Sequence, residues 1–246
     1  MSHRATNAEK LARIRDDFAL STEQSEMLLQ LASRTVDLEI SGTAISDVST
    51  ALDAHVADSL SGLRIDAIKS ARTAIDIGAG VGFPGLVLAI ARPDLSVTLL
   101  DSVRKKMETA SSIARELDLK NVDCVWARVE EFSAVGSDAR ESFDLVTSRA
   151  LAPLAALLEY SAPLLREPIG SDFASMVAWK GDPDSDELAM AEAAAAVLGM
   201  SVGEPIPASP YPGSRARQFF LAEKRSATDQ RFPRRPGVAL RKPLSG

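Results

Sequence analysis

The chain has little of the side-chain chemistry on which many metalloproteins and secreted proteins depend. It holds one cysteine, Cys124, and two histidines, His3 and His55. A single cysteine excludes an intrachain disulfide framework, which agrees with a reducing compartment. These side chains are also too few for a zinc site of the usual Cys/His kind, so we expect no metal.

Long apolar runs are absent as well. No stretch of about 18 consecutive apolar residues, the length that a membrane-spanning helix needs, occurs in the sequence. The N-terminal sequence MSHRATNAEKLARIRDDF is charged throughout and lacks the apolar centre of a signal peptide. These absences predict a cytoplasmic protein without membrane contact. Because no strong heptad seam is visible either, we expect a monomer.

Charge is unevenly distributed along the chain. The formal net charge is −6, yet residues 215–242 hold nine Lys or Arg residues against only Glu223 and Asp229. A basic end on an acidic body favours contact with a polyanion, because phosphates respond to the local field. A solvated tail without a partner would have the same composition, so composition alone leaves both interpretations open.

From residue 73 onward, short apolar segments alternate with amphipathic ones. The predicted strands cover residues 73–77, 96–101, 122–127, 143–148, 173–180 and 217–224. The predicted helices cover residues 85–91, 103–119, 153–165 and 184–199. This alternation indicates an α/β protein with a doubly wound, mostly parallel sheet, whose ligand lies at the carboxyl ends of the strands.

The ends of the chain differ from this central pattern. Apolar residues before residue 70 recur with helical spacing, as in Leu11, Ile14 and Phe18. We therefore predict an N-terminal helical extension (residues 1–70), a ligand-binding domain (71–225) and a basic C-terminal tail (226–246).

A glycine-rich loop, DIGAGVGFPG, occupies residues 76–85 at the end of the first predicted strand. The backbone amides of such a loop can approach a ligand closely. A Walker-type phosphate loop is excluded, because no Gly-Lys-Ser/Thr sequence follows. A dinucleotide fingerprint GxGxxG does run from Gly80 to Gly85, although Pro84 lies inside it.

The acid at the start of the loop favours S-adenosylmethionine over a dinucleotide. This cofactor carries a positive sulfonium and an ammonium group and has no pyrophosphate, so Asp76 can accept from the ammonium group directly or through water. Gly78, Gly80 and Gly82 allow the ligand to lie against the backbone. Asp101, at the end of the second strand, offers a carboxylate to the ribose hydroxyls. Nicotinamide dinucleotide sites use such an acid too, so an NAD-type oxidoreductase stays open.

The sequence also limits the methyl acceptor. Enzymes that methylate exocyclic base amines commonly carry an Asn/Asp-Pro-Pro-aromatic motif after the fourth strand, where residues 147–151 read TSRAL. A pyrimidine carbon usually needs a cysteine nucleophile, and Cys124 lies within a predicted strand. An acceptor with a free lone pair, such as a purine ring nitrogen, remains. Arg149 could contact the cofactor or a guanine edge, or form only a surface ion pair.

Several motifs, in order, resemble one known family. The segments DIGAGVGFPGLVLAIARPDLSVTLLDS, HVADSL, LDLKNV, ARVEEF, FDLVTSRALAPL, WKG and RFPRRPGVALRKPL are similar to those of the bacterial small-subunit rRNA guanine-N7 methyltransferases, the RsmG family, formerly GidB. The resemblance implies a class I methyltransferase fold with a mostly parallel seven-stranded sheet after an N-terminal helical extension. It also implies methyl transfer to N7 of a guanine in the decoding-region loop of 16S rRNA.

The resemblance further implies roles for individual residues, with 16S rRNA or the small ribosomal subunit as partner. The cofactor contacts would be Gly78 and its glycine neighbours, Phe83, Val129, Glu130 and Arg149, with Val129 and Glu130 beside the adenine. The RNA contacts would be Lys180, Arg231, Arg234, Arg235, Arg241 and Lys242. His55 and Asp58 form part of the HVADSL motif. Because the reaction needs no general base, we expect His55 to have a packing or positioning role. A non-catalytic ribosome-assembly factor that keeps this fold is a further alternative.

The role of Asp76 can be tested by substitution. Asp76→Ala is expected to abolish binding of S-adenosylmethionine while the fold persists, because the carboxylate is lost from the ligand loop. Calorimetric titration with the cofactor measures the first effect, and circular dichroism checks the second. Unchanged affinity would show that Asp76 does not contribute to cofactor binding.

Overall fold

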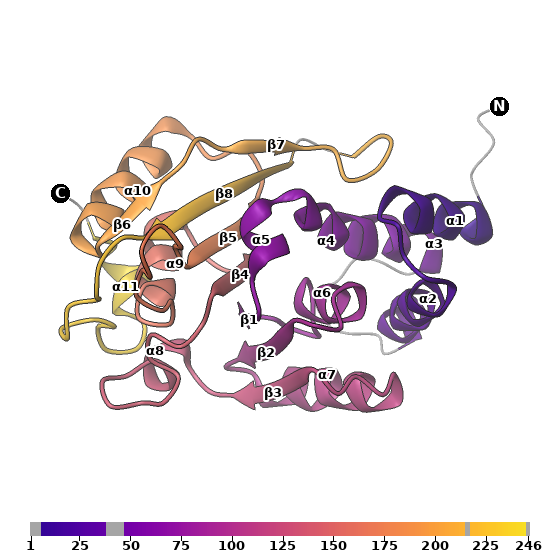
Figure 1. The fold of residues 1–246 in the computed structure, drawn as a ribbon, viewed down its shortest axis with the longest axis horizontal. Helices are drawn as coiled ribbons and strands as arrows, with labels where there is room; N and C mark the ends of the chain where they lie inside the picture. Colours follow the sequence, from indigo (N-terminus) through magenta and orange to yellow (C-terminus); the bar gives the residue numbers. More distant parts are fainter. Residues whose placement is uncertain (1–5, 38–46, 215–216, 245–246) are drawn as a thin grey trace.

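A central sheet forms the middle of the computed structural model, which describes residues 6–37, 47–214 and 217–244 (Figure 1). In these ranges eight strands follow the order β3-β2-β1-β4-β5-β8-β6, and the short β7 also pairs with β8. The strands are β1 (Thr73–Ile77), β2 (Ser96–Asp101), β3 (Val122–Trp126), β4 (Leu145–Arg149), β5 (Ser175–Lys180), β6 (Met200–Val202), β7 (Ile206–Ala208) and β8 (Arg217–Lys224).

Strands β1 to β5 pair in parallel, and only β8 and its partners are antiparallel. The chain first proceeds from β1 outward to β3 and then returns to add β4 on the other side of β1. Ligands of open α/β sheets bind at such a point of reversal. The predicted doubly wound, mostly parallel sheet is confirmed.

The number of strands differs from the expected seven because one edge strand is interrupted. Met200 of β6 pairs with Lys224, and Ile206 of β7 pairs with Phe219, both on β8. The register shifts by one residue between the two pairs, as in a β-bulge. Pro205 lies in this gap and has no N–H to donate to the ladder. The sequence pattern had predicted no strand here, because each segment has only three residues.

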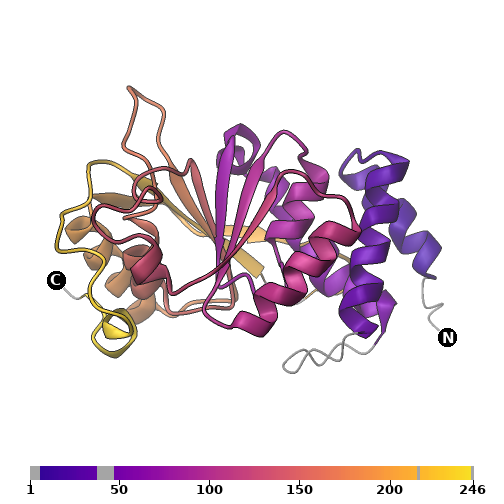
Figure 2. The ribbon, with the colours of Figure 1, turned by 90° about the horizontal axis from the view of Figure 1, so that it is seen from below.

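Helices cover both faces of the sheet (Figure 2). Helices α6 (Gly85–Ala91) and α7 (Arg104–Glu116) lie on one face, and α8 (Val129–Phe132), α9 (Leu154–Ser161) and α10 (Ser185–Val197) lie on the other. The strands serve both layers by alternation: Ala74 of β1 belongs to the first hydrophobic cluster, whereas Ile75 and Ile77 belong to the second. Asp76 therefore points toward α6.

The helices before the sheet pack onto α6. Ile14 and Leu28 share one hydrophobic cluster with Leu86 of α6. These helices are α1 (Asn7–Asp17), α2 (Thr22–Asp37), α3 (Val48–Ala51), the π-helical turn η1 (Leu52–Ala57), α4 (Asp58–Leu60), the 3-10 turn η2 (Ser61–Arg64) and α5 (Asp66–Ser70). Residues 1–5 and 38–46 of the predicted extension lie outside the described residues. The predicted division into an extension, a domain and a tail stays a prediction.

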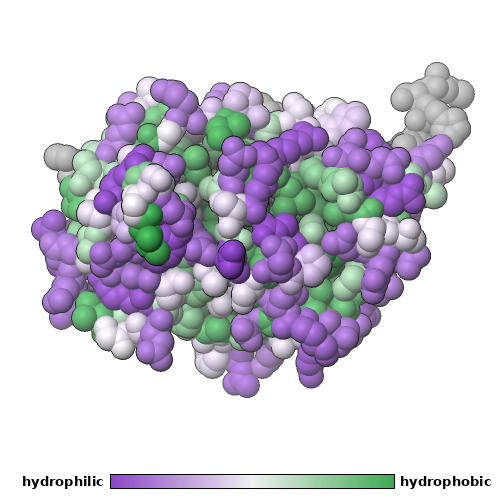
Figure 3. Space-filling model, viewed as in Figure 1, coloured by the Kyte–Doolittle hydropathy of each residue, from purple (hydrophilic) through white to green (hydrophobic). Residues whose placement is uncertain are grey.

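Within the described residues, no helix combines the length and the apolar character needed to cross a bilayer. Figure 3 shows hydrophilic and apolar residues interspersed over one face of the molecule.

The residues after β8, which we call the C-terminal segment (residues 226–244), pack against the second face of the sheet. Its short helix α11 (Val238–Arg241) contacts α9. Phe232 and Ala239 are buried. Arg140 donates from its guanidinium to the carbonyl oxygens of Thr228, at 3.0 Å, and Phe232, at 2.8 Å. The segment is thus part of the packed structure.

Arg234 of this segment forms a buried ion pair with α9. Its Nε donates to Oε1 of Glu159 at 2.8 Å, its backbone N–H donates to the same oxygen at 3.2 Å, and its Nη2 contacts Oε2. The Glu159 side chain is 1% exposed. Arg234 therefore faces inward, whereas the other predicted RNA contacts of the segment are exposed: Arg231, Arg235, Arg241 and Lys242.

This ion pair predicts a difference between two neighbouring arginines. Arg234→Ala is expected to lower the free energy of unfolding by about 3 kcal/mol, because it leaves a buried carboxylate without its partner. Arg235→Ala, the matched control at an exposed site, is expected to change it by less than about 0.5 kcal/mol. Urea-induced unfolding measures both values. Equal values for the two variants would contradict the burial of this pair.

Candidate functional site

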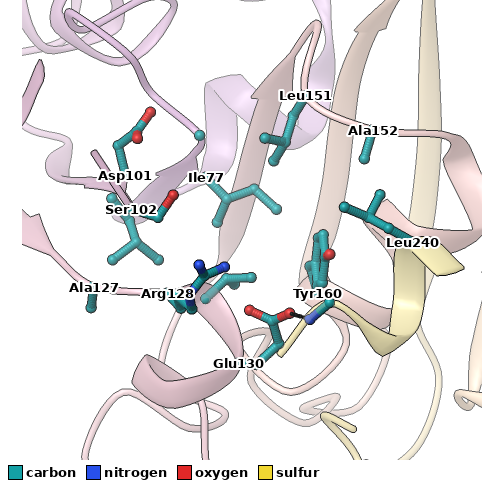
Figure 4. A pocket seen from close by; sticks show the side chains of 14 residues that line it. Ile77, Asp101, Ser102, Ala127, Arg128, Glu130, Leu151, Ala152, Tyr160 and Leu240 are labelled. Carbon is teal, nitrogen blue, oxygen red and sulfur yellow. Dashed lines mark hydrogen bonds between the residues drawn. The ribbon is translucent and has the colours of Figure 1, made fainter. Parts of the chain in front are cut away.

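A cavity of about 160 Å³ opens at the carboxyl ends of β1, β2 and β3 (Figure 4). It is lined by Ile77, Gly78, Leu100, Asp101, Ser102, Ala127, Arg128, Val129, Glu130, Leu151, Ala152, Tyr160, Gly237 and Leu240. Larger hollows of about 370 Å³ and 550 Å³ lie between α2 and α7 and beside the start of β5, away from the glycine loop. The cavity at the strand ends is thus where the sequence predicts the ligand.

Gly78 lines this cavity, and Gly80 is bonded to Asp101, which also lines it. Gly78 has a φ of +68°, and a Cβ added to it would lie 2.5 Å from Cδ1 of Leu151. Gly80 has a φ of +61°, and a Cβ there would meet no atom within 4 Å. Both conformations favour glycine, but only Gly80 faces open space. A ligand can therefore lie directly against the backbone at Gly80.

Asp101 adjoins this open space and orders the loop. Its Oδ2 accepts from the backbone N–H of Gly80 at 3.0 Å, and its Oδ1 accepts from that of Val103 at 2.8 Å. The side chain lines the cavity although the residue is only 8% exposed. Each carboxylate oxygen has two lone pairs, so each retains one for a ribose hydroxyl.

Asp76 lies beneath the loop and does not line the cavity. It is fully buried, with Oδ2 accepting from the N–H of Gly85 at 2.9 Å and Oδ1 accepting from the Thr147 hydroxyl at 3.1 Å. It therefore ties the start of α6 and strand β4 to β1. Burial raises the pKa of Asp76 to about 7, although these hydrogen bonds and the charge of Arg149 act in the opposite direction.

Val129 and Glu130, the predicted neighbours of the adenine, line the cavity at the start of α8. Oε1 of Glu130 accepts from the backbone N–H of Gly237 at 2.8 Å, and Figure 4 shows this bond. Gly237 and Leu240 bring the C-terminal segment into the cavity wall. Neither residue is among the site residues predicted from the sequence, because no local pattern indicates that this segment returns to α8.

Arg149 and Phe83 meet each other outside the residues that line the cavity. Nη1 of Arg149 donates to Oδ2 of Asp58 at 3.1 Å and to the carbonyl of Ala54 at 3.2 Å. Its guanidinium carbon lies 5.4 Å from the centre of the Phe83 ring, which stacks on His55 at 4.7 Å. The HVADSL motif therefore holds Arg149 at the end of β4.

His55 lies in the π-helical turn η1, and such turns are frequent at functional sites. Burial and the nearby charge of Arg149 lower the pKa of His55 to about 4, so the ring is neutral near pH 7. Its Nδ1 lies 3.1 Å from Nη2 of Arg149. A guanidinium can only donate, so Nδ1 accepts and Nε2 carries the hydrogen. This state favours the predicted positioning role over a general base.

Lys180 lies at the end of β5 and is already ion-paired. Its Nζ lies 2.7 Å from Oε1 of Glu187, which also accepts from the N–H of Leu154 at 3.0 Å. In the described part of the chain, no group of three or more His, Cys, Asp or Glu side chains could hold a metal ion.

Solved structures with the same architecture identify the fold. The cofactor-bound protein Rv0187 from MTB matches with a TM-score of 0.55 and 20% identity, over 91% of this chain and 100% of that chain. The S-adenosylmethionine-dependent methyltransferase SibL in its apo form matches with a TM-score of 0.54 and 13% identity, over 89% of this chain and 74% of that chain. The predicted class I methyltransferase fold is confirmed.

Sequence comparison then identifies the family. The family described as GidB, rRNA small subunit methyltransferase G, matches residues 26–205. The Ribosomal RNA small subunit methyltransferase G of Moorella thermoacetica is 36% identical over 92% of this chain and 92% of its own. That of Desulfitobacterium hafniense is 36% identical over 96% and 95% of the two chains. The chain belongs to this family.

Membership confirms the resemblance predicted from the motifs, and with it an enzyme that uses S-adenosylmethionine. An NAD-type oxidoreductase and a non-catalytic assembly factor find no support in these comparisons. The roles of the individual site residues stay predictions.

The burial of Asp76 predicts a pH effect on stability. Its pKa is about 7 in the folded state and 3.8 as the ordinary value. Between these values the folded state holds a proton that the unfolded state lacks, so this contribution is present at low pH and is lost as the pH rises through about 7.

Asp76→Asn removes this titration while the size of the side chain is kept. The wild-type protein is therefore expected to lose free energy of unfolding, relative to the variant, between about pH 4 and about pH 7. Urea-induced unfolding across this range measures the difference. Parallel pH profiles would show that the carboxyl group is not buried as described.

Proposed function

We propose that the protein transfers the methyl group of S-adenosylmethionine to N7 of a guanine in the decoding-region loop of 16S rRNA. The observation that carries this proposal is the cavity at the strand ends, which is lined by Gly78, Asp101 and the start of α8. Gly80 is hydrogen-bonded to Asp101, and a Cβ added to it would meet no atom within 4 Å. Its relatives bear the name Ribosomal RNA small subunit methyltransferase G. The protein acts as a monomer in the cytoplasm.

The residues of the cavity fit this cofactor. Val129 and Glu130 hold the adenine end, and Asp101 accepts from the ribose hydroxyls with its free lone pairs. The methionine part lies against Gly78, which lines the cavity, and against Gly80, where a side chain would meet no atom within 4 Å. Asp76 acts from below by fixing the loop, through Gly85 and Thr147. When bound, the cofactor supplies an electrophilic methyl group on a positively charged sulfur.

Methylation of this acceptor nitrogen requires no strong base from the protein. N7 of guanine has an in-plane lone pair, so alignment and electrostatics dominate catalysis. Burial raises the pKa of Cys124 to about 11, which makes this thiol a poor nucleophile. His55 is neutral, and its Nδ1 is occupied by Arg149.

Arg149 is the residue best suited to orient the base. A guanidinium has five N–H donors, and Arg149 uses three hydrogen bonds to fix itself on Ala54, His55 and Asp58. The remaining donors are available to a guanine edge or to the cofactor. Because these bonds fix the guanidinium plane, the free N–H donors of Arg149 are preorganised. A lysine ammonium lacks this planar arrangement of donors.

Cationic side chains along two edges of the molecule are proposed to contact RNA phosphates. They are Lys180 at the end of β5 and Arg231, Arg235, Arg241 and Lys242 of the C-terminal segment. Arg231 lies 3.4 Å from Asp229, so it has a competing partner at the surface. We leave Arg234 out of this group, because its guanidinium is committed to the buried Glu159.

Labelled-methyl transfer tests the proposal. The enzyme is incubated with naked 16S rRNA and, separately, with purified small subunits, and the modified base is then identified. We expect label at N7 of one guanine. Arg149→Lys is expected to lower the rate by about tenfold or more, because the fixed fork is lost. Label in another base would refute the acceptor, and cofactor binding without any transfer would favour the assembly factor.

A further inference from the structure

The cavity wall contains a part of the chain that neither the glycine loop nor the strand ends supply. Leu240 lines the cavity and yet is 51% exposed. Leu151 lines it as well and is 40% exposed. In Figure 4, Leu240 and Tyr160 lie on one side of the cavity, and Asp101 and Ser102 lie on the other. Two large apolar side chains that stay partly exposed at one cavity are suited to cover an apolar part of a ligand.

The C-terminal segment is held at this position by specific bonds. The backbone N–H of Gly237 donates to Glu130 at 2.8 Å, and Arg234 forms the buried ion pair with Glu159 of α9. Nη2 of Arg234 also donates to the carbonyl of Lys242 at 2.9 Å, which ties the end of α11 back to its anchor. The wall is therefore a defined structure.

The same segment carries exposed cations, of which Arg241 donates from Nε to the carbonyl of Gly237 at 3.2 Å. Arg231, Arg235, Arg241 and Lys242 are exposed, and none of them lines the cavity. One short stretch of chain thus offers an apolar and hydrogen-bonding side to the cavity and a cationic side to solvent.

We infer that the C-terminal segment is a wall of the cofactor site, in which Leu240 contacts the nucleoside part of the cofactor and Gly237 holds the Glu130 carboxylate in place. This inference rests on the proposed function. RNA phosphates on the outer cations and cofactor at Leu240 contact the same segment, so the order that one ligand adds to the segment raises the affinity for the other. By thermodynamic linkage, the two effects have the same factor.

Two variants of the segment distinguish the role of its apolar side, at Leu240, from that of its cationic side, at Arg235. S-adenosylhomocysteine, the demethylated form of the donor, serves as the probe in calorimetric titrations of the full chain without RNA. Leu240→Ala is expected to weaken its binding roughly tenfold, since a half-exposed leucine loses the area that the ligand would cover. Arg235→Ala, the matched control, keeps wild-type affinity for the probe. Because Leu240 is half exposed, its replacement leaves folding intact, which circular dichroism verifies.

RNA binding gives the reverse pattern. With a hairpin of the decoding-region loop, Arg235→Ala weakens binding and lowers the salt slope by about one, whereas Leu240→Ala without cofactor binds as the wild type does. In the wild-type protein, the hairpin is expected to tighten binding of S-adenosylhomocysteine severalfold. Hydrogen exchange adds a readout independent of activity: the probe is expected to slow exchange of amides in residues 232–242.

The outcomes are distinguishable. A wild-type protein that does not bind S-adenosylhomocysteine at all would overturn the proposed function itself. If the wild type binds the probe but Leu240→Ala binds it equally well, and exchange in residues 232–242 is unchanged, the wall is refuted. If the probe binds with the same affinity with and without the hairpin, the linkage is refuted.

Discussion

A buried carboxylate joins the three parts of the protein on which the ligand site depends. Asp76 is inaccessible to solvent and receives hydrogen bonds from the first amide of α6 and from the hydroxyl of Thr147 on β4. It thereby fixes the distance between the glycine loop and the strand on the far side of the point of reversal. The loop held in this way brings Gly80 to Asp101, whose carboxylate accepts from the backbone N–H of Gly80.

The remaining parts of the site are supplied from outside the central sheet. His55 lies in the π-helical turn η1, and Asp58 is the first residue after this turn. Both side chains contact Arg149 at the end of β4. On the opposite side, Glu130 meets the C-terminal segment. The sheet thus forms the base of the site, and the segments before and after the sheet form its sides.

The sequence predicted much of this because local chemistry determines it. The strand at residues 73–77 and the helix at 85–91 were predicted to the residue, since apolar runs and glycines mark their ends. The proximity of Gly80 and Asp101 follows from parallel strands that end at one edge of the sheet. In contrast, Asp76 points inward because of the strand alternation and the packing of α6 on this face. The loop motif alone does not indicate this orientation.

Other features depend on contacts between distant residues, and the sequence could not have shown them. A basic stretch predicts a cationic surface, but nothing near Arg234 in the sequence indicates that Glu159 lies buried beside it. The split of the edge strand into β6 and β7 likewise depends on pairing with β8, which comes later in the chain. Composition predicts the charge of a segment, whereas the fold determines which residue each charged side chain contacts.

The bond between Glu130 and Gly237 joins residues 107 positions apart. Contacts of such separation form only after the intervening chain is ordered, so an unfolded or half-folded chain has no complete pocket. A ligand that recognises only the finished pocket stabilises the native state in proportion to the logarithm of its concentration above the dissociation constant. Saturation with the methyl donor therefore raises the free energy of unfolding of this protein, in addition to supplying the reaction.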